Sequence, residues 1–177
     1  YLWEILGIGM SAFFLSFQPN RDPLKGKFLS NILKKAIPGG TMIILAVAIY
    51  FILYIVNSNG SFYTTIDSLE LATSMSVLSM SALSLVILYK VCEPLNKYRG
   101  IVFGSATLAS ILLVGLSYYV TITKSYEASI LKINFSLMTG ENVFVVILVT
   151  FLLAGIYLTV NQIVEIITGE DEENENQ

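Results

Sequence analysis

Long apolar runs alternate with short polar stretches along this chain. Four runs, at roughly 37–56, 71–91, 101–122 and 143–163, hold about 20 residues each, and a shorter fifth run covers 1–17. A helix needs about 20 mostly apolar residues to cross about 30 Å of hydrocarbon. The pattern therefore predicts an all-α fold, an integral membrane helical bundle of about five transmembrane helices with short connectors.

The composition supports a membrane protein. Hydrophobic residues make up 55% of the 177 residues and charged residues 13%, against about 25% charged residues in soluble domains. A disordered chain would need low hydrophobicity instead. Histidine is absent and Cys92 is the only cysteine, which excludes a Cys/His metal cluster, an intrachain disulfide and a Ser-His or Cys-His catalytic pair. The charge pattern also gives no support for a nucleic-acid partner.

Basic residues in the connectors predict the orientation of the bundle. Connector 18–36 carries five Lys or Arg residues, 57–70 none, 90–100 three and 123–142 two. The positive-inside rule places the first and third connectors in the cytoplasm. We therefore expect a multi-pass protein of the cell membrane with a cytoplasmic C-terminus. The chain starts with Tyr1 rather than Met, inside an apolar run, so we expect it to belong to a longer polypeptide.

Two polar segments flank the predicted helices. Residues 170–177 carry five acids and no apolar residue, which predicts a disordered, acidic cytoplasmic tail after a bundle spanning 1–169. In connector 18–36, apolar residues recur at helical spacing between lysines, which predicts an amphipathic helix at the membrane surface. That helix is either a surface linker or a docking surface for a cytoplasmic domain of the same protein.

Glu4 is the ionisable residue in the apolar part of a predicted span. A charge at the centre of a membrane helix costs about 2.5–3.5 kcal/mol on insertion scales, so it usually has a partner, a cation or a proton. Its carboxylate suits a hard cation such as Ca²⁺ or Mg²⁺, and Gly7 and Gly9 could loosen the helix beside it. Glu4 is thus a candidate ligand for a transported cation. Alternatively, it faces water near the outer headgroups.

The second full span is rich in hydroxyl side chains. Ser74, Ser81 and Ser84 fall on one side of the predicted helix, and Ser76 and Ser79 fall roughly opposite. Small hydroxyl residues let helices approach closely and hydrogen-bond across the contact. We predict this packing role in preference to the lining of a permeation path.

Residues at the span ends fit the membrane interface. Tyr118, Tyr119 and Tyr157 suit an aromatic belt, and Lys90 can reach the headgroups from the end of its span. Pro38 is expected at the cytoplasmic start of a helix, where a missing N–H does little harm.

The first 29 residues carry a family resemblance. Residues 2–20, LWEILGIGMSAFFLSFQPN, continued by 21–29, RDPLKGKFL, resemble the sixth membrane helix and following cytoplasmic loop of bacterial cation-transporting P-type ATPases. The resemblance implies that this chain covers membrane helices six to ten. It also implies that the missing N-terminal helices and cytoplasmic domains are partners, that ATP and Mg²⁺ serve the full-length protein, and that loop 18–36 contacts the phosphorylation domain.

The resemblance gives Glu4 a role, but this chain departs from the calcium-pump pattern at several positions. Glu4 lines up with the first sixth-helix ligand position of calcium pumps, where those pumps have asparagine. Ile8 stands where they carry an aspartate, Gly7 where threonine is usual, and span 71–91 has no acid. The resemblance therefore implies either one cation site using Glu4 or a site built mostly from the missing helices, with calcium as the first choice of ion.

No catalytic site is visible in the sequence itself. There is no Gly-rich phosphate loop and no DKTG phosphorylation sequence, so we expect no catalytic residue and no bound cofactor in this part. The alternative to the pump is a stand-alone small membrane protein that packs beside a partner as an accessory or structural subunit.

Overall fold

The computed structural model describes residues 13–14, 28–58, 66–93, 96–123 and 131–175. The described chain is all-α, as predicted.

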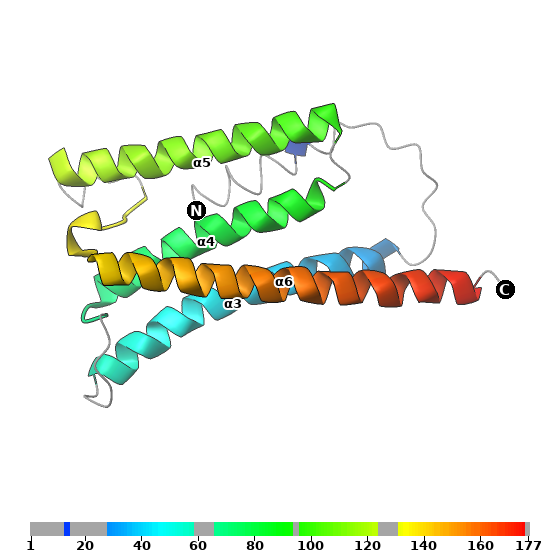
Figure 1. Ribbon diagram of the computed structural model, residues 1–177, viewed down its shortest axis with the longest axis horizontal. Coiled ribbons are helices and arrows are strands. Elements are labelled where there is room, and N and C mark those ends of the chain that lie inside the picture. Colours follow the sequence, from blue (N-terminus) through cyan, green and yellow to red (C-terminus); the bar gives the residue numbers. More distant parts are fainter. Residues whose placement is uncertain (1–12, 15–27, 59–65, 94–95, 124–130, 176–177) are drawn as a thin grey trace.

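Four long helices and one short 3₁₀ helix follow each other in the sequence. They are α3 (Phe28–Ser58), α4 (Leu69–Val91), α5 (Lys97–Thr123), η3 (Phe135–Leu137) and α6 (Gly140–Glu175). All four long helices contain a stretch that is long and apolar enough to cross a membrane. Successive helices run in opposite directions (Figure 1). The described part of the chain is therefore a multi-pass membrane bundle, and each of the four full predicted spans lies within one helix.

Helix α4 is the central helix of the bundle. In its most apolar stretch 56% of the residues are buried, whereas the value for each of the other three helices is 22% or less. A core cluster joins α4 to α3 and α6 through Tyr50, Met75, Leu83, Leu153 and Tyr157. Helix α5 packs beside α4 on another side, near Leu88 and Ala106.

The two ends of the bundle differ in their described charges. At one end, α4 finishes and α5 begins, and Lys90, Lys97 and Arg99 lie there. We call this the Lys90 end; the C-terminal end of α6 lies on the same side (Figure 1). The opposite end, which we call the Asn134 end, carries the connector between α5 and α6, with Lys132 as its described basic residue.

Helix α3 differs from the prediction at its start. It begins at Phe28 and continues through Pro38 without interruption, so residues 28–36 extend the membrane helix rather than forming a separate surface helix. Pro38 lies inside the helix, where its missing N–H removes only one backbone hydrogen bond. Thr41 Oγ1 donates to the Pro38 carbonyl over 2.9 Å. Residues 18–27 lie outside the described residues.

Helix α6 continues to Glu175, into the acidic segment for which the sequence predicted a disordered end. Glutamate is a good helix former, so a helix that is already nucleated can extend through such residues.

Tyr157 also differs from the prediction. Its side chain is 2% exposed and packs in the α3–α4–α6 core, so it does not belong to an interfacial belt. Tyr118 and Tyr119 are more than half exposed near the end of α5, as a belt requires. Tyr157 is buried because it lies on the same face of α6 as Leu153 and Asn161, which are also buried.

Candidate functional site

The predicted cation ligand lies outside the described residues. Glu4, with its neighbours Gly7 and Ile8, belongs to residues 1–12. Within the described ranges, no group of three or more His, Cys, Asp or Glu side chains could hold a metal ion. The assignment of Glu4 as a cation ligand therefore stays a prediction.

One contact fixes where the first segment meets the bundle. Phe13 and Phe14 are helical, and the Tyr98 hydroxyl donates to the Phe14 carbonyl over 2.8 Å. Tyr98 is the second residue of α5. Phe14 therefore lies at the Lys90 end, beside the start of α5.

The serines of α4 are all buried, and four of them satisfy their hydroxyl protons within the helix. Ser74, Ser76, Ser81 and Ser84 donate to the carbonyl four residues earlier over 2.7 to 2.8 Å. Such bonds hide the polarity of the hydroxyl and leave a small side chain at the helix surface. Close packing between helices follows, as the sequence predicted.

Ser79 is the exception, because it links three helices. Its Oγ lies 2.5 Å from the Tyr50 hydroxyl on α3, and Thr150 on α6 donates to it over 3.0 Å. Tyr50 and Ser79 are both 0% exposed. This hydroxyl network joins α3, α4 and α6 in the middle of the bundle.

The opposite face of α4 meets the connector between α5 and α6. The Asn134 backbone N–H donates to Ser74 Oγ over 2.9 Å, and its side-chain amide donates to Glu70 Oε1 over 3.0 Å. Thr121 Oγ1 on α5 is 3.1 Å from the Ile133 carbonyl. The connector is therefore hydrogen-bonded to α4 as well as to α5, the helix that precedes it.

Asn134 also heads an Asn-Phe-Ser sequence that matches the glycosylation signal. Its side chain is 7% exposed and engaged with Glu70. The folded protein does not present this asparagine for modification.

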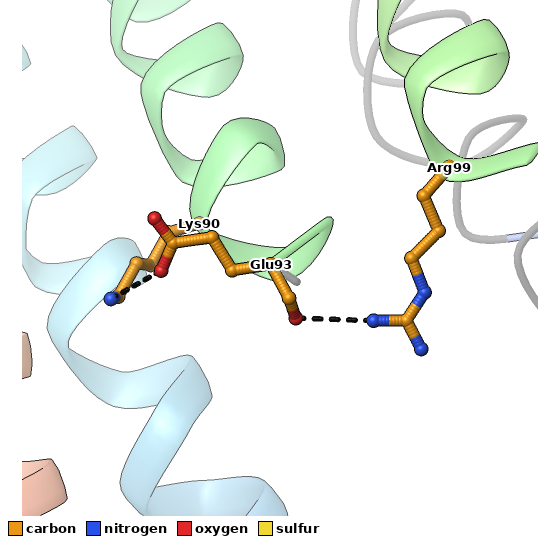
Figure 2. Close-up of polar contacts among 3 residues, drawn as sticks. All are labelled: Lys90, Glu93 and Arg99. Carbon is orange, nitrogen blue, oxygen red and sulfur yellow. Dashed lines mark hydrogen bonds and ion pairs between the residues drawn. The ribbon is translucent and has the colours of Figure 1, made fainter. Parts of the chain in front are cut away.

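Charged residues cluster at the Lys90 end (Figure 2). Lys90 Nζ lies 2.5 Å from Glu93 Oε2, and the Arg99 guanidinium donates to the Glu93 carbonyl over 3.1 Å. The Lys90 side chain is 15% exposed and is held against Glu93. Glu93 thus ties the end of α4 to the start of α5.

Cys92 is buried in the same turn. Its backbone N–H donates to the Leu88 carbonyl, and it packs beside Ala106. Burial raises the pKa of the Cys92 thiol, and the nearby positive charge of Arg99 opposes this shift only in part. The thiol is therefore protonated at neutral pH and poorly reactive.

Sequence reasoning missed Tyr50, Thr150 and Asn134. Tyr50 and Thr150 are polar residues with apolar neighbours on both sides, which is a usable signal because membrane helices rarely carry polar groups without partners. Nothing in the sequence pairs them with Ser79. Asn134 lies in a polar connector, where an asparagine gives no distinct signal.

Comparison with known proteins finds a distant relative. The calcium-transporting ATPase CtpE of Mycolicibacterium smegmatis is 28% identical to this chain over 109 residues. The match covers 62% of this chain and 13% of the relative's length. No family model matches the chain, and no solved structure matches it significantly. The chain is thus a multi-pass membrane protein with distant similarity to a calcium-transporting ATPase.

Proposed function

We propose that this chain forms the C-terminal membrane part of an ATP-driven cation pump of the P-type ATPase family, with calcium as the transported ion. The observation that carries the proposal is the similarity to CtpE. The four membrane helices and the resemblance of residues 2–29 to the sixth helix and loop of such pumps support it.

In this function the chain serves as a scaffold for the transport domain. The α3–α4–α6 core and its hydroxyl network form a rigid unit. Tyr98 anchors the segment that carries Phe14 beside it. The first ten residues, with Glu4, can then contribute to an ion path whose other ligands come from helices outside this chain. ATP and Mg²⁺ are used by cytoplasmic domains that also lie outside it.

The orientation proposed here puts the Lys90 end in the cytoplasm. Its described residues include Lys90, Lys97 and Arg99, whereas the described part of the Asn134 end includes Lys132. This asymmetry agrees with the positive-inside rule. The acidic C-terminus would then be cytoplasmic as well.

Calcium uptake by the complete protein tests the proposal. Membrane vesicles containing the pump should accumulate radioactive calcium when ATP and Mg²⁺ are added, and a calcium ionophore should release it. Glu4→Gln and Glu4→Ala should reduce the calcium sensitivity of phosphorylation. If calcium-stimulated phosphorylation in both variants is unchanged from the parent pump, Glu4 is structural. Absence of ATP-dependent calcium uptake would refute calcium as the ion.

The coding sequence before Tyr1 provides the cheapest test against the accessory-subunit alternative. The pump requires a DKTG phosphorylation sequence several hundred residues upstream, whereas a stand-alone subunit requires a start codon just before Tyr1. The isolated chain should show no ATPase activity, and measurable ATP turnover by it would contradict the placement of catalysis elsewhere.

A further inference from the structure

Asn161 is a buried polar side chain in the membrane-spanning part of α6. It is 5% exposed and lies within the apolar stretch Gly140–Val164. No described residue hydrogen-bonds to its side-chain amide, whereas each of the buried serines of α4 has a hydrogen-bond partner. Buried polar groups of native proteins are hydrogen-bonded to protein or to ordered water. The amide of Asn161 therefore requires a further partner.

The core cluster shows which helix Asn161 faces. Tyr157, one turn before Asn161 on the same face of α6, belongs to the same cluster of buried residues as Met42 of α3. Helices α3 and α6 are in contact and run in opposite directions, and the start of α3 lies beside the second half of α6 (Figure 1). One turn beyond the layer of Tyr157 and Met42, Asn161 on α6 therefore meets Pro38 on α3.

The hydroxyl network gives the same register for the two helices. Tyr50 of α3 and Thr150 of α6 both bond to Ser79. Pro38 lies 12 residues from Tyr50, and Asn161 lies 11 residues from Thr150, both towards the Lys90 end. At the rise of an α-helix, both residues are therefore roughly 16–18 Å from the network along the bundle.

Pro38 provides a hydrogen-bond acceptor at this level. Proline has no N–H, so the carbonyl of Lys34, four residues earlier, has no donor within α3. Residues four apart lie above one another along a helix, so this carbonyl is on the same face as Pro38. That face is the core face, because Pro38 is buried and so are the residues that follow it at intervals of four, Met42, Ala46 and Tyr50.

One water molecule can satisfy both groups. It can accept a hydrogen bond from the Asn161 amide N–H and donate one to the Lys34 carbonyl. Proline is tolerated in membrane helices because hydroxyl side chains, neighbouring helices or ordered waters bond to the carbonyl that it frees. The nearby Thr41 hydroxyl does not do so, because it donates to the carbonyl of Pro38 itself.

We propose that one ordered water molecule is bound between α3 and α6, where it bridges the Asn161 amide and the Lys34 carbonyl that Pro38 frees. The bridge ties the first part of α3, residues 28–38, to α6 at the Lys90 end. This part of α3 precedes the core residue Met42, so the water holds it where direct contacts of the core do not reach. The site does not rest on the proposed pump function.

Replacing Asn161 by leucine tests the site, because a bridged amide and an unpaired amide predict effects of opposite sign. Leucine has nearly the same shape and no polar atom. With the water bound, Asn161→Leu should lower the folding equilibrium constant of the full chain in mixed micelles about 5- to 10-fold, because the Lys34 carbonyl loses its donor. An unpaired amide predicts stabilisation instead. The matched control is Gln162→Leu at the exposed neighbouring position, which should change the constant less than about twofold.

Pro38→Ala tests the other partner of the water. Alanine restores the N–H, so the Lys34 carbonyl is hydrogen-bonded within α3. In the Pro38→Ala background, Asn161→Leu should no longer lower the folding constant, because the water has lost its acceptor. Equal losses in both backgrounds would show that Asn161 acts through packing alone and would overturn the proposal.

Nuclear magnetic resonance can detect the water directly in the full chain with isotope-labelled asparagine. The Asn161 amide signals are identified by their loss in Asn161→Leu. In a rotating-frame spectrum they should show cross-relaxation with a long-lived water, and this signal should weaken in Pro38→Ala. Absence of the signal, or stabilisation by Asn161→Leu, would refute the site. Stability that rises with sodium or potassium concentration in the parent protein, but not in Asn161→Leu, would overturn water in favour of a bound ion.

Discussion

Ser79 is the residue whose loss should loosen the core most clearly. It joins Tyr50 on α3 and Thr150 on α6 through hydrogen bonds of 2.5 and 3.0 Å, in a fully buried position of α4. Ser79→Ala removes the shared oxygen and keeps the helix backbone. The Tyr50 hydroxyl, 29 residues away in the sequence, is then left without this partner in the interior.

The loss of stability in Ser79→Ala depends on whether Tyr50 and Thr150 find other hydrogen-bond partners. An unsatisfied buried hydroxyl costs about 1–3 kcal/mol, but hydrogen bonds between membrane helices average only about 0.6 kcal/mol, with a maximum of about 1.7. Thr150 can turn to a carbonyl of its own helix, as Thr159 does with Gly155. The cost therefore falls mainly on Tyr50, and we expect Ser79→Ala to lower the free energy of unfolding by about 1–2 kcal/mol.

A double-mutant cycle separates the hydrogen bond from packing. Tyr50→Phe should cost less than Ser79→Ala, because it removes the hydroxyl that would otherwise be left unpaired. The double variant should be no less stable than Ser79→Ala alone. Unfolding is followed by circular dichroism during titration of mixed micelles with a denaturing detergent. Ser76→Ala is the control, since Ser76 bonds only to Ala72 of its own helix.

Two results would refute this reasoning. If Ser79→Ala is as mild as Ser76→Ala, the network does not stabilise the core. If the effects of Tyr50→Phe and Ser79→Ala simply add, the two hydroxyls are not coupled in the folded protein.

Two further predictions concern the Lys90 end. A Cβ on Gly39 would lie 3.2 Å from the Ile87 side chain, whereas a Cβ on Gly40 meets nothing within 4 Å. Because alanine is the better helix former by about 0.5–1 kcal/mol, Gly40→Ala should stabilise the protein by about that amount. Overpacking should leave Gly39→Ala about 1 kcal/mol less stable than Gly40→Ala; equal melting temperatures for the two would contradict the contact. Burial raises the pKa of the Cys92 thiol in the folded protein above its value in the unfolded protein. The buried, protonated thiol therefore contributes its full stabilisation at neutral pH. This contribution is lost as pH rises through the pKa of the folded protein. Maleimide should label Cys92 slowly in the native protein and quickly in the detergent-unfolded protein. Cys92→Ser should reduce the loss of unfolding free energy at alkaline pH. Rapid labelling of the native protein would disprove the burial.

The serines of α4 show how much of the packing the sequence could predict. Helical periodicity alone separated Ser74, Ser81 and Ser84 from Ser76 and Ser79, and the bonds of Ser74 and Ser79 to different neighbours confirm that separation. Periodicity could not say which face meets which helix. The candidate cation ligand Glu4 rests on the sequence alone, because it lies outside the described residues.

The sequence by itself determined the class, the four full membrane spans and their alternating direction, because the bilayer requires each crossing to be a long apolar helix. Only the tertiary structure decided that α4 is central, that Tyr157 enters the core and that residues 131–138 fold back between α4 and α5. The reason is physical: lipid is as apolar as leucine, so hydrophobicity does not distinguish a lipid-facing side chain from a buried one. Close packing and a few interhelical hydrogen bonds make that choice, and they form only when distant segments meet.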